Sequence, residues 1–276
     1  MRSAATVDTA ALPLAEWAGI SVLLMAAMVG WVMMQGGGAL TWDAFNHHIY
    51  LGRQALEGSR LLWDYFAAGE MSCQYPQGYA PLVAMLDAGW SGTAVFAVLT
   101  LLAALSVPAC WLITWSLLPS RSNSAMGLRL AGTVLANSSV LWWKLLEQTS
   151  NDAIGMMLAI WAVALVMLCV DAARWQGRAK GRFALCALAG GLAGLAFVVK
   201  MTQFIGVLAA FCILLFLEGR WSERVKYILC FGLAALLISV AVGWSWAMDS
   251  WRACGSPIYP FMLDYFSAHV PGTGAP

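Results

Sequence analysis

A carboxylate and two imidazoles stand close together just after three consecutive glycines at 36–38. Asp43, His47 and His48 belong to the stretch TWDAFNHHIY at 41–50. If this stretch is helical, Asp43 and His47 are four residues apart and share a face. The carboxylate could then act as a general base toward a hydroxyl or an amine, while the histidines orient it or bind phosphate. The structural alternative is that Asp43 caps an interfacial helix and that both histidines lie in the headgroup layer of a membrane.

A second acid, Asp152, follows Thr149, Ser150 and Asn151 at the start of a long apolar run. Serine, asparagine and aspartate are frequent at helix N-termini, and a carboxylate there is stabilised by the helix dipole. Capping alone would therefore account for this group. The catalytic alternative is that Asp152 faces the same compartment as Asp43, so that the two acids converge on one cavity.

Lys200 is the single charged residue in the turn VVKMTQ at 198–203. It could pair with a lipid phosphate, or its long side chain could simply reach the headgroup layer. Two further segments, QYPQGYAP at 74–81 and GSPIYPF at 255–261, contain Gly and Pro residues that prevent a regular helix and present tyrosines at the membrane surface. Each segment is either an interfacial turn or part of a binding site.

The elements that position these residues are set by a very apolar composition. Of 276 residues, 61% are apolar and 11% are charged, which indicates a lipid rather than an aqueous environment. The net charge of +1, with Lys and Arg scattered between apolar runs, argues against a nucleic-acid partner. The first apolar run is too long for the core of a signal peptide and lacks a clear cleavage site, so we expect it to be retained as a span.

The sequence predicts an all-α, polytopic membrane bundle of about seven transmembrane helices, in a single module over residues 1–276. Each predicted span is an apolar run near the roughly 20 residues needed to cross the hydrocarbon core. The spans are residues 14–35, 92–118, 128–146, 153–170, 183–199, 202–218 and 227–248. Residues 36–91 form the first outer loop. The apolar part of this loop, residues 79–90, is short and interrupted by Pro81 and Asp87, which indicates an interfacial or re-entrant helix.

The distribution of Lys and Arg orients the predicted bundle. With the N-terminus in the cytoplasm, ten of the 15 cations fall on the cytoplasmic side, as the positive-inside rule requires. These ten are Arg2, Arg121, Arg129, Arg174, Arg178, Lys180, Arg182, Arg220, Arg224 and Lys226. We therefore predict an integral protein of the inner (plasma) membrane with Asp43, Asp152 and Lys200 on its periplasmic, or extracytoplasmic, face.

The seven cysteines show no spacing typical of a zinc site. Five of them lie inside apolar runs and are expected to pack between helices or against lipid. These five are Cys110, Cys169, Cys186, Cys212 and Cys230. Cys73 and Cys254 both fall in predicted outer loops, where they either form a disulfide or remain free thiols.

In order and topology, these motifs resemble the GT-C superfamily of membrane glycosyltransferases, which use polyprenyl-phosphate-linked sugars on the outer face of the membrane. Members have an acid in the first outer loop soon after span 1, as Asp43 is here, and an acid at the start of a later span, as Asp152 is here. They also have a Tyr/Pro-rich patch and a Gly-Asn-Pro-aromatic-Pro-Phe-type segment, in which this chain has Ser256 instead of Asn. GT-C enzymes usually continue with further spans, so the chain resembles their N-terminal seven-span module, as a truncated product or fragment would.

The resemblance implies that Asp43 is the base that activates the acceptor, that Asp152 is a second acid and that Lys200 partners the donor phosphate. The reaction would be an inverting attack on the anomeric carbon that displaces a polyprenyl phosphate or pyrophosphate and glycosylates a lipid or glycan acceptor. We predict further substrate-binding residues at His47, His48, Gln74, Tyr75, Asn151 and Tyr259. No metal or other cofactor is required, although Asp43 with His47 could bind a divalent ion.

Two other functions stay open. A transporter or lipid-binding protein without catalysis would be expected to carry charged or broken segments at mid-span, whereas the polar residues here gather at the outer ends of the spans. An inactive GT-C fragment that packs with a partner would share the sequence features but not the reaction. Membrane lipids surround the chain in each case.

Overall fold

The computed structural model of the chain describes residues 12–38, 41–58, 71, 73–170, 179–217 and 220–269. Within these ranges the fold is all-helical and has no strand, as predicted. Among the described residues, five helical segments are long and apolar enough to cross a membrane. They are α1 (Leu14–Met34), α5 with α6 (Gly92–Ala104 and Ser106–Leu117), α9 (Asp152–Val170), α10 (Ala179–Val199) and α12 (Trp221–Cys254).

Parts of the predicted topology fall outside the described residues. These parts are residues 39–40, 59–70 and 72 of the predicted outer loop, residue 218 of the sixth predicted span, and Arg2, Arg174 and Arg178 of the cytoplasmic set. The first, second, fourth, fifth and seventh predicted spans all correspond to segments of sufficient length and hydropathy. The last of them, α12, has 34 residues and is about 50 Å long, so it exceeds the roughly 30 Å hydrocarbon core and one end must project from it.

The third predicted span, residues 128–146, is two helices rather than one: α7 (Asn123–Ala136) and α8 (Val140–Leu146). The break falls at Asn137 and Ser139. The side chain of Asn137 donates to the carbonyl of Thr133, and the Ser139 hydroxyl accepts from the amide of Trp142. Short polar side chains that bond to nearby backbone compete with helical hydrogen bonds, which explains the interruption.

The sixth predicted span is also shorter than expected. It begins with a 3₁₀ turn, η5 (Met201–Gln203), and continues as α11 (Phe204–Leu215). At 12 residues, α11 is about 18 Å long by itself, which is less than the hydrocarbon thickness.

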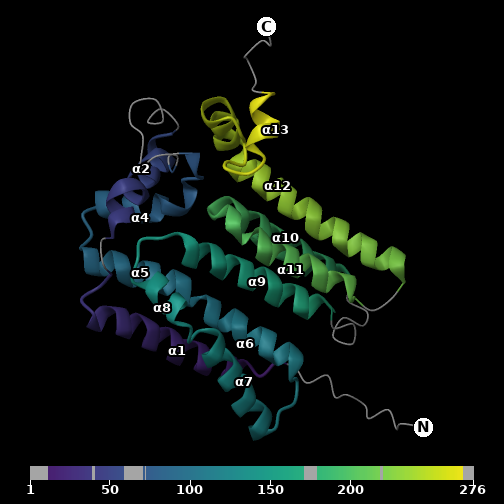
Figure 1. Cartoon of the computed structure of the whole chain (residues 1–276). Coiled ribbons are helices and arrows are strands. Elements are labelled where there is room, and N and C mark those ends of the chain that lie inside the picture. The colour runs from purple at the N-terminus through teal and green to yellow at the C-terminus, as the bar shows by residue number, and fades with distance from the viewer. Residues whose placement is uncertain are drawn as a thin grey trace.

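The long helices lie side by side, while several short ones collect at one end (Figure 1). Neighbours in space follow the order α1, α5–α6, α9, α10 and α12, with α7 against α6 and α11 against α9. The short helices at this end include η1 (Ala44–His48), α2 (Ile49–Glu57), η3 (Gln77–Tyr79), α4 (Ala80–Asp87) and α13 (Leu263–Ser267). Helix α4 matches the predicted short helix of the outer loop. At this end α9 begins and α10 and α12 finish, so the residues with candidate chemistry meet there.

Glycines allow α10 and α12 to approach closely. A methyl group at position 194 would lie 2.3 Å from the carbonyl oxygen of Ala235, and one at position 190 would lie 2.2 Å from that of Phe231. Without side chains at these positions, the two backbones come into contact, which is the usual packing of helices in membranes.

We predict that Gly194→Ala destabilises the protein by about 1–3 kcal/mol, because the added methyl group forces the two backbones apart. Gly232→Ala on α12 is the matched control, since a methyl group there meets nothing within 4 Å. Thermal unfolding in lipid nanodiscs measures both. Equal unfolding temperatures for the two variants would contradict the close contact.

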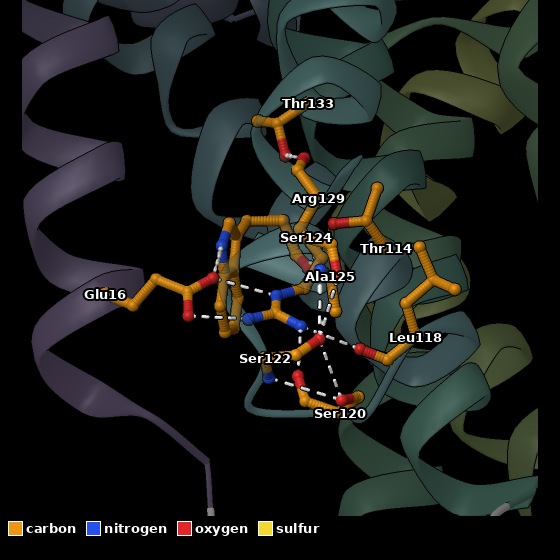
Figure 2. Close-up of polar contacts among 10 residues, drawn as sticks. Glu16, Thr114, Leu118, Ser120, Ser122, Ser124, Ala125, Arg129 and Thr133 are labelled. Carbon is orange, nitrogen blue, oxygen red and sulfur yellow. Dashed lines mark hydrogen bonds and ion pairs between the residues drawn. The ribbon is translucent and has the colours of Figure 1, made fainter. Parts of the chain in front are cut away.

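A buried ion pair joins α1 to α7 at the opposite end of the bundle (Figure 2). Arg129 has no exposed surface, and its Nε and Nη2 donate to the two carboxylate oxygens of Glu16 at 2.8 and 2.6 Å. Its Nη1 donates to the carbonyls of Leu118 and Ser120, and its guanidinium carbon lies 4.9 Å from the ring centre of Trp115. Arg129, which the sequence analysis counts among the cytoplasmic cations, is therefore buried inside the bundle, because α7 carries it to a position opposite Glu16.

We predict that Arg129→Met destabilises the protein by about 3–5 kcal/mol, because it leaves the Glu16 carboxylate without its partner in a largely buried place. The double variant with Glu16→Leu should recover most of the loss. Lys226→Met, which breaks an exposed pair with Glu223, is the control and should cost less than about 1 kcal/mol. Denaturant titration in mixed micelles gives the comparison, and no recovery in the double variant would contradict the pairing.

Candidate active site

Asp43 and His47 lie on one side of a π-helical turn. Asp43 directly precedes η1, and His47 Nδ1 is 3.9 Å from Asp43 Oδ1. The Asp43 side chain is half-exposed, whereas His47 is buried. Burial lowers the pKa of His47, against the opposing effect of Asp43 and together with that of Lys200. Thus Asp43 and His47 are neighbours as predicted, with the carboxylate half-exposed and the imidazole buried and neutral.

His48 points to a different set of partners. Its Nδ1 is 2.6 Å from the Thr149 hydroxyl, and its ring stacks on that of Tyr79 at 4.6 Å between centres. Burial, with the nearby His47 and Lys200, lowers the pKa of His48 to about 3, although Asp152 opposes the shift. At neutral pH His48 therefore offers hydrogen bonds but no positive charge for a phosphate.

Asp152, at the start of α9, pairs across the site with Lys200. Lys200 Nζ is 3.3 Å from Asp152 Oδ2, which also accepts from the Ser150 hydroxyl. The hydroxyl of Ser150 accepts in turn from the Asp152 amide, so Ser150 performs the local capping. The side chain of Asn151 has a different role: its Nδ2 donates to the carbonyl of Val199 at 2.7 Å. The side chains of Asn151 and Asp152 thus tie the start of α9 to the end of α10.

A cavity of about 280 Å³ opens between the end of α10 and the C-terminal turn after α12. Five of the predicted substrate-binding residues line it: Gln74, Tyr75, Asn151, Lys200 and Tyr259. Thr202 and Phe261 complete its polar and aromatic sides. The two histidines do not line this cavity. They lie near its charged lining residue, since Lys200 adds to the lowering of both of their pKa values.

A disulfide holds the two Tyr/Pro-rich segments together at this cavity. Cys73 and Cys254 are bonded, which settles the alternative that the sequence left open, and the five other cysteines are free as expected. Tyr75 donates to the carbonyl of Pro257 at 2.9 Å, and burial raises the pKa of Tyr75 to about 12. The first outer loop and the chain after α12 therefore form one wall.

Glycines let the elements around the site come into contact. A methyl group at position 78, in η3, would lie 2.7 Å from the Asn151 side chain, and one at position 155 would lie 3.2 Å from Lys200 Cβ. The Gly78 contact places Tyr79 beside the start of α9. Both Asp43 and Asp152 contribute to a raised pKa of Tyr79, although burial is the larger cause. The two acids therefore lie near the same buried tyrosine, although neither of them lines the cavity.

Tyr79 and Thr149 are site residues that the sequence interpretation did not single out. Tyr79 lies in the Tyr/Pro-rich segment and Thr149 in the group before Asp152, so both belonged to recognised motifs. Both contact His48 from segments that are distant from it in the chain, so residue spacing could not predict these contacts. Among the described residues, no three His, Cys, Asp or Glu side chains are grouped to hold a metal ion. That the protein needs no metal or other cofactor stays a prediction.

Comparisons of the chain with protein-family models, with curated proteins and with solved structures gave no match. The assignment of a function therefore depends on the residues and geometry of this chain.

We predict that the protein becomes less stable by about 1 kcal/mol between pH 6 and pH 5 through His48. Because its folded pKa is lowered to about 3 from 6.5, the unfolded chain takes up the proton first, so this loss begins below pH 6.5 and continues toward pH 3. His48→Gln should flatten the dependence, and His269→Gln, at an exposed position, should not. Unfolding at several pH values tests this, and identical slopes in wild type and His48→Gln would contradict it.

Proposed function

We propose that the chain is a GT-C-type glycosyltransferase that moves a sugar from a polyprenyl-phosphate donor to a lipid or glycan acceptor on the extracytoplasmic face of the inner membrane. The observation that carries the proposal is the common cavity. Residues from four separate sequence motifs line it, and the Asp152–Lys200 pair stands at its edge. Asp43 and Asp152 do not line the cavity, but both lie near enough to Tyr79 to add to the rise in its pKa, of which burial is the larger cause. Separate capping or interfacial roles would not require four motifs to meet at one cavity.

In this proposal Asp43 is the general base. Its half-exposed carboxylate is accessible to an acceptor, and the neutral His47 behind it does not compete as a cation. As the acceptor oxygen forms its bond to the anomeric carbon, its proton passes to Asp43 and the bond to the donor phosphate breaks. Lys200 lies near the leaving phosphate, and its pairing with Asp152 holds its ammonium in place.

The proposed topology has the N-terminus inside and seven crossings. Besides the five long segments, α7 with α8 and η5 with α11 are the two further crossings, each assembled from shorter helical pieces. Figure 1 supports this arrangement, because the short outer-loop helices and α13 gather at one end of the bundle. The positive-inside distribution then assigns this end to the extracytoplasmic face.

The transporter alternative is favoured by one observation, the interruption of the third span at 137–139. Discontinuous helices often bind substrates at mid-membrane. Here, however, the buried polar groups near the break satisfy one another: Ser106 donates to Asn137, which donates to Thr133. The cavities on either side measure about 80 and 100 Å³, too small for a solute path. Glycosyl transfer therefore fits the arrangement better.

We predict that Asp43→Asn lowers sugar transfer by about 100- to 10,000-fold, because the amide cannot accept the acceptor proton. The assay uses the protein in proteoliposomes with a panel of radiolabelled polyprenyl-phosphate sugars. Asp87→Asn is the matched control, since Asp87 is an exposed carboxylate of the same loop that pairs with Arg53. Equal non-zero transfer by wild type and Asp43→Asn would refute the assigned base, and no transfer from any donor would favour the inactive fragment or the transporter.

A further inference from the structure

The turn that carries Asp43 has an apolar outward side. The two histidines of the turn, His47 and His48, are buried on its inward side. The half-exposed carboxylate of Asp43 stands on the outward side with two aromatic rings, Trp42 at 68% exposed and Phe45 at 65%. Large apolar groups that gather on a surface beside a reactive group indicate an interaction site.

The start of this turn lies close to the outer ends of two spans. Trp31 in the last turn of α1 and Trp90 just before α5 are both about half-exposed, and tryptophan is enriched at the level of the lipid headgroups. The chain that leaves α1 passes against the first turns of α5, since a methyl group at Gly38 would overlap the ring of Phe96. Four residues then lead to Trp42, which limits its distance from Gly38 to about 14 Å.

Exposed residues change from aromatic to charged along the helix that begins with this turn. The backbone is helical without a break from Trp42 through η1 and α2 to Glu57, which lies about 20 Å farther along the axis. At that far end Arg53 pairs with Glu57 and with Asp87 of α4, and all three side chains are about half-exposed. Charged pairs of this kind stay in water, so the aromatic end of the helix is the one suited to lipid.

The outward side of the turn is poorly equipped to bind a water-soluble glycan. Such a ligand needs several hydrogen-bonding groups around it. Among residues 42–46, the polar side chains are Asp43 and Asn46, and Asn46 Nδ2 already donates to the carbonyl of Trp42 at 2.7 Å. Apolar exposure, by contrast, continues from the lipid-facing end of α1, where Met34 is 76% exposed. A membrane lipid is therefore the occupant that this surface fits.

We propose that Trp42 and Phe45 hold the Asp43 turn against the outer headgroup layer, and that the acceptor is a membrane lipid whose headgroup hydroxyl enters from that layer. The inference rests on the proposed function, because it names the acceptor class of that reaction. The lipid oxygen bonds to the anomeric carbon, its proton passes to Asp43, and the bond from this carbon to the donor phosphate oxygen breaks. The products are a glycolipid and a polyprenyl phosphate.

The first experiment tests lipid contact by placing the photoreactive residue benzoylphenylalanine at position 45, in nanodiscs of phosphatidylethanolamine and phosphatidylglycerol. Position 22, which is exposed in the middle of α1, is the reference for lipid, and position 57 is the reference for water. Mass spectrometry after irradiation should find about five-fold more lipid adduct at position 45 than at position 57. A yield at position 45 no higher than that at position 57 would overturn the proposal.

The second experiment identifies the acceptor in phosphatidylcholine proteoliposomes that contain the panel of labelled donors. Either diacylglycerol and phosphatidylglycerol are added to the bilayer, or glucose and maltose are added to the solution. Mild acid then cleaves the glycosyl phosphate of unused donor, so label that stays soluble in chloroform is glycolipid. We expect such label with the hydroxyl lipids, whereas label on the water-soluble sugars alone would overturn the acceptor assignment.

The aromatic side is tested with Phe45→Ser, which should raise the apparent KM for the lipid acceptor by about 3- to 10-fold because the turn loses contact with the headgroup layer. Its Tm should not change, since Phe45 is exposed. Leu56→Ser is the matched control, because Leu56 is an exposed apolar residue at the far end of the same helix. An equal KM in the two variants would contradict the role of Phe45.

These outcomes are separable from that of the proposed transferase. Lipid adducts at position 45 without transfer from any donor would retain the lipid contact and reject the enzyme, and the acceptor assignment with it. Transfer to soluble sugars that is lost in Asp43→Asn would retain the enzyme and reject the lipid acceptor. Crosslinking and transfer therefore fail independently.

Discussion

A polar side chain inside an apolar helix bundle must find its partner within the protein, because hydrocarbon supplies none. This constraint organises both ends of the molecule. At one end Arg129 distributes its donors among Glu16 and two carbonyls of the turn after α6, so the first helix is fixed to α6 and α7 (Figure 2). At the other end the same rule is met only in part. Lys200 and Asp152 satisfy each other, whereas Tyr79 and Asn151 each keep one unsatisfied atom.

The Arg129–Glu16 pair is a structural ion pair, whereas the Asp152–Lys200 pair lies beside a cavity. A buried charge that is fully paired contributes to specificity of packing and needs no ligand. Unpaired buried atoms have a free-energy cost that the fold must offset elsewhere. Here the disulfide between Cys73 and Cys254 helps to hold the surrounding segments, since it joins the outer loop to the end of α12.

Much of the fold follows from the sequence, because a long apolar run in a bilayer can pair all of its backbone N–H and C=O groups by forming a helix. The break in the third span does not follow from average hydropathy. It depends on hydrogen bonds between the side chains of Asn137 and Ser139 and nearby backbone groups. An average of hydropathy over a window of residues does not detect such bonds. The pair of Glu16 and Arg129 was likewise out of reach, since the two residues are 113 positions apart and each lies near the end of a predicted span.

The site was predictable where its chemistry is local and not where it is shared between helices. Asp43 and His47 are neighbours because a helical turn makes them so, and the structure preserves that relation. The pairing of Lys200 with Asp152 needed knowledge that the end of α10 meets the start of α9, which the glycine at 155 permits. That pairing has a chemical consequence. A lysine already paired with a carboxylate attracts a second anion less strongly than a free one, but its ammonium is held in one place, so recognition at the cavity depends on the direction of hydrogen bonds as well as on charge.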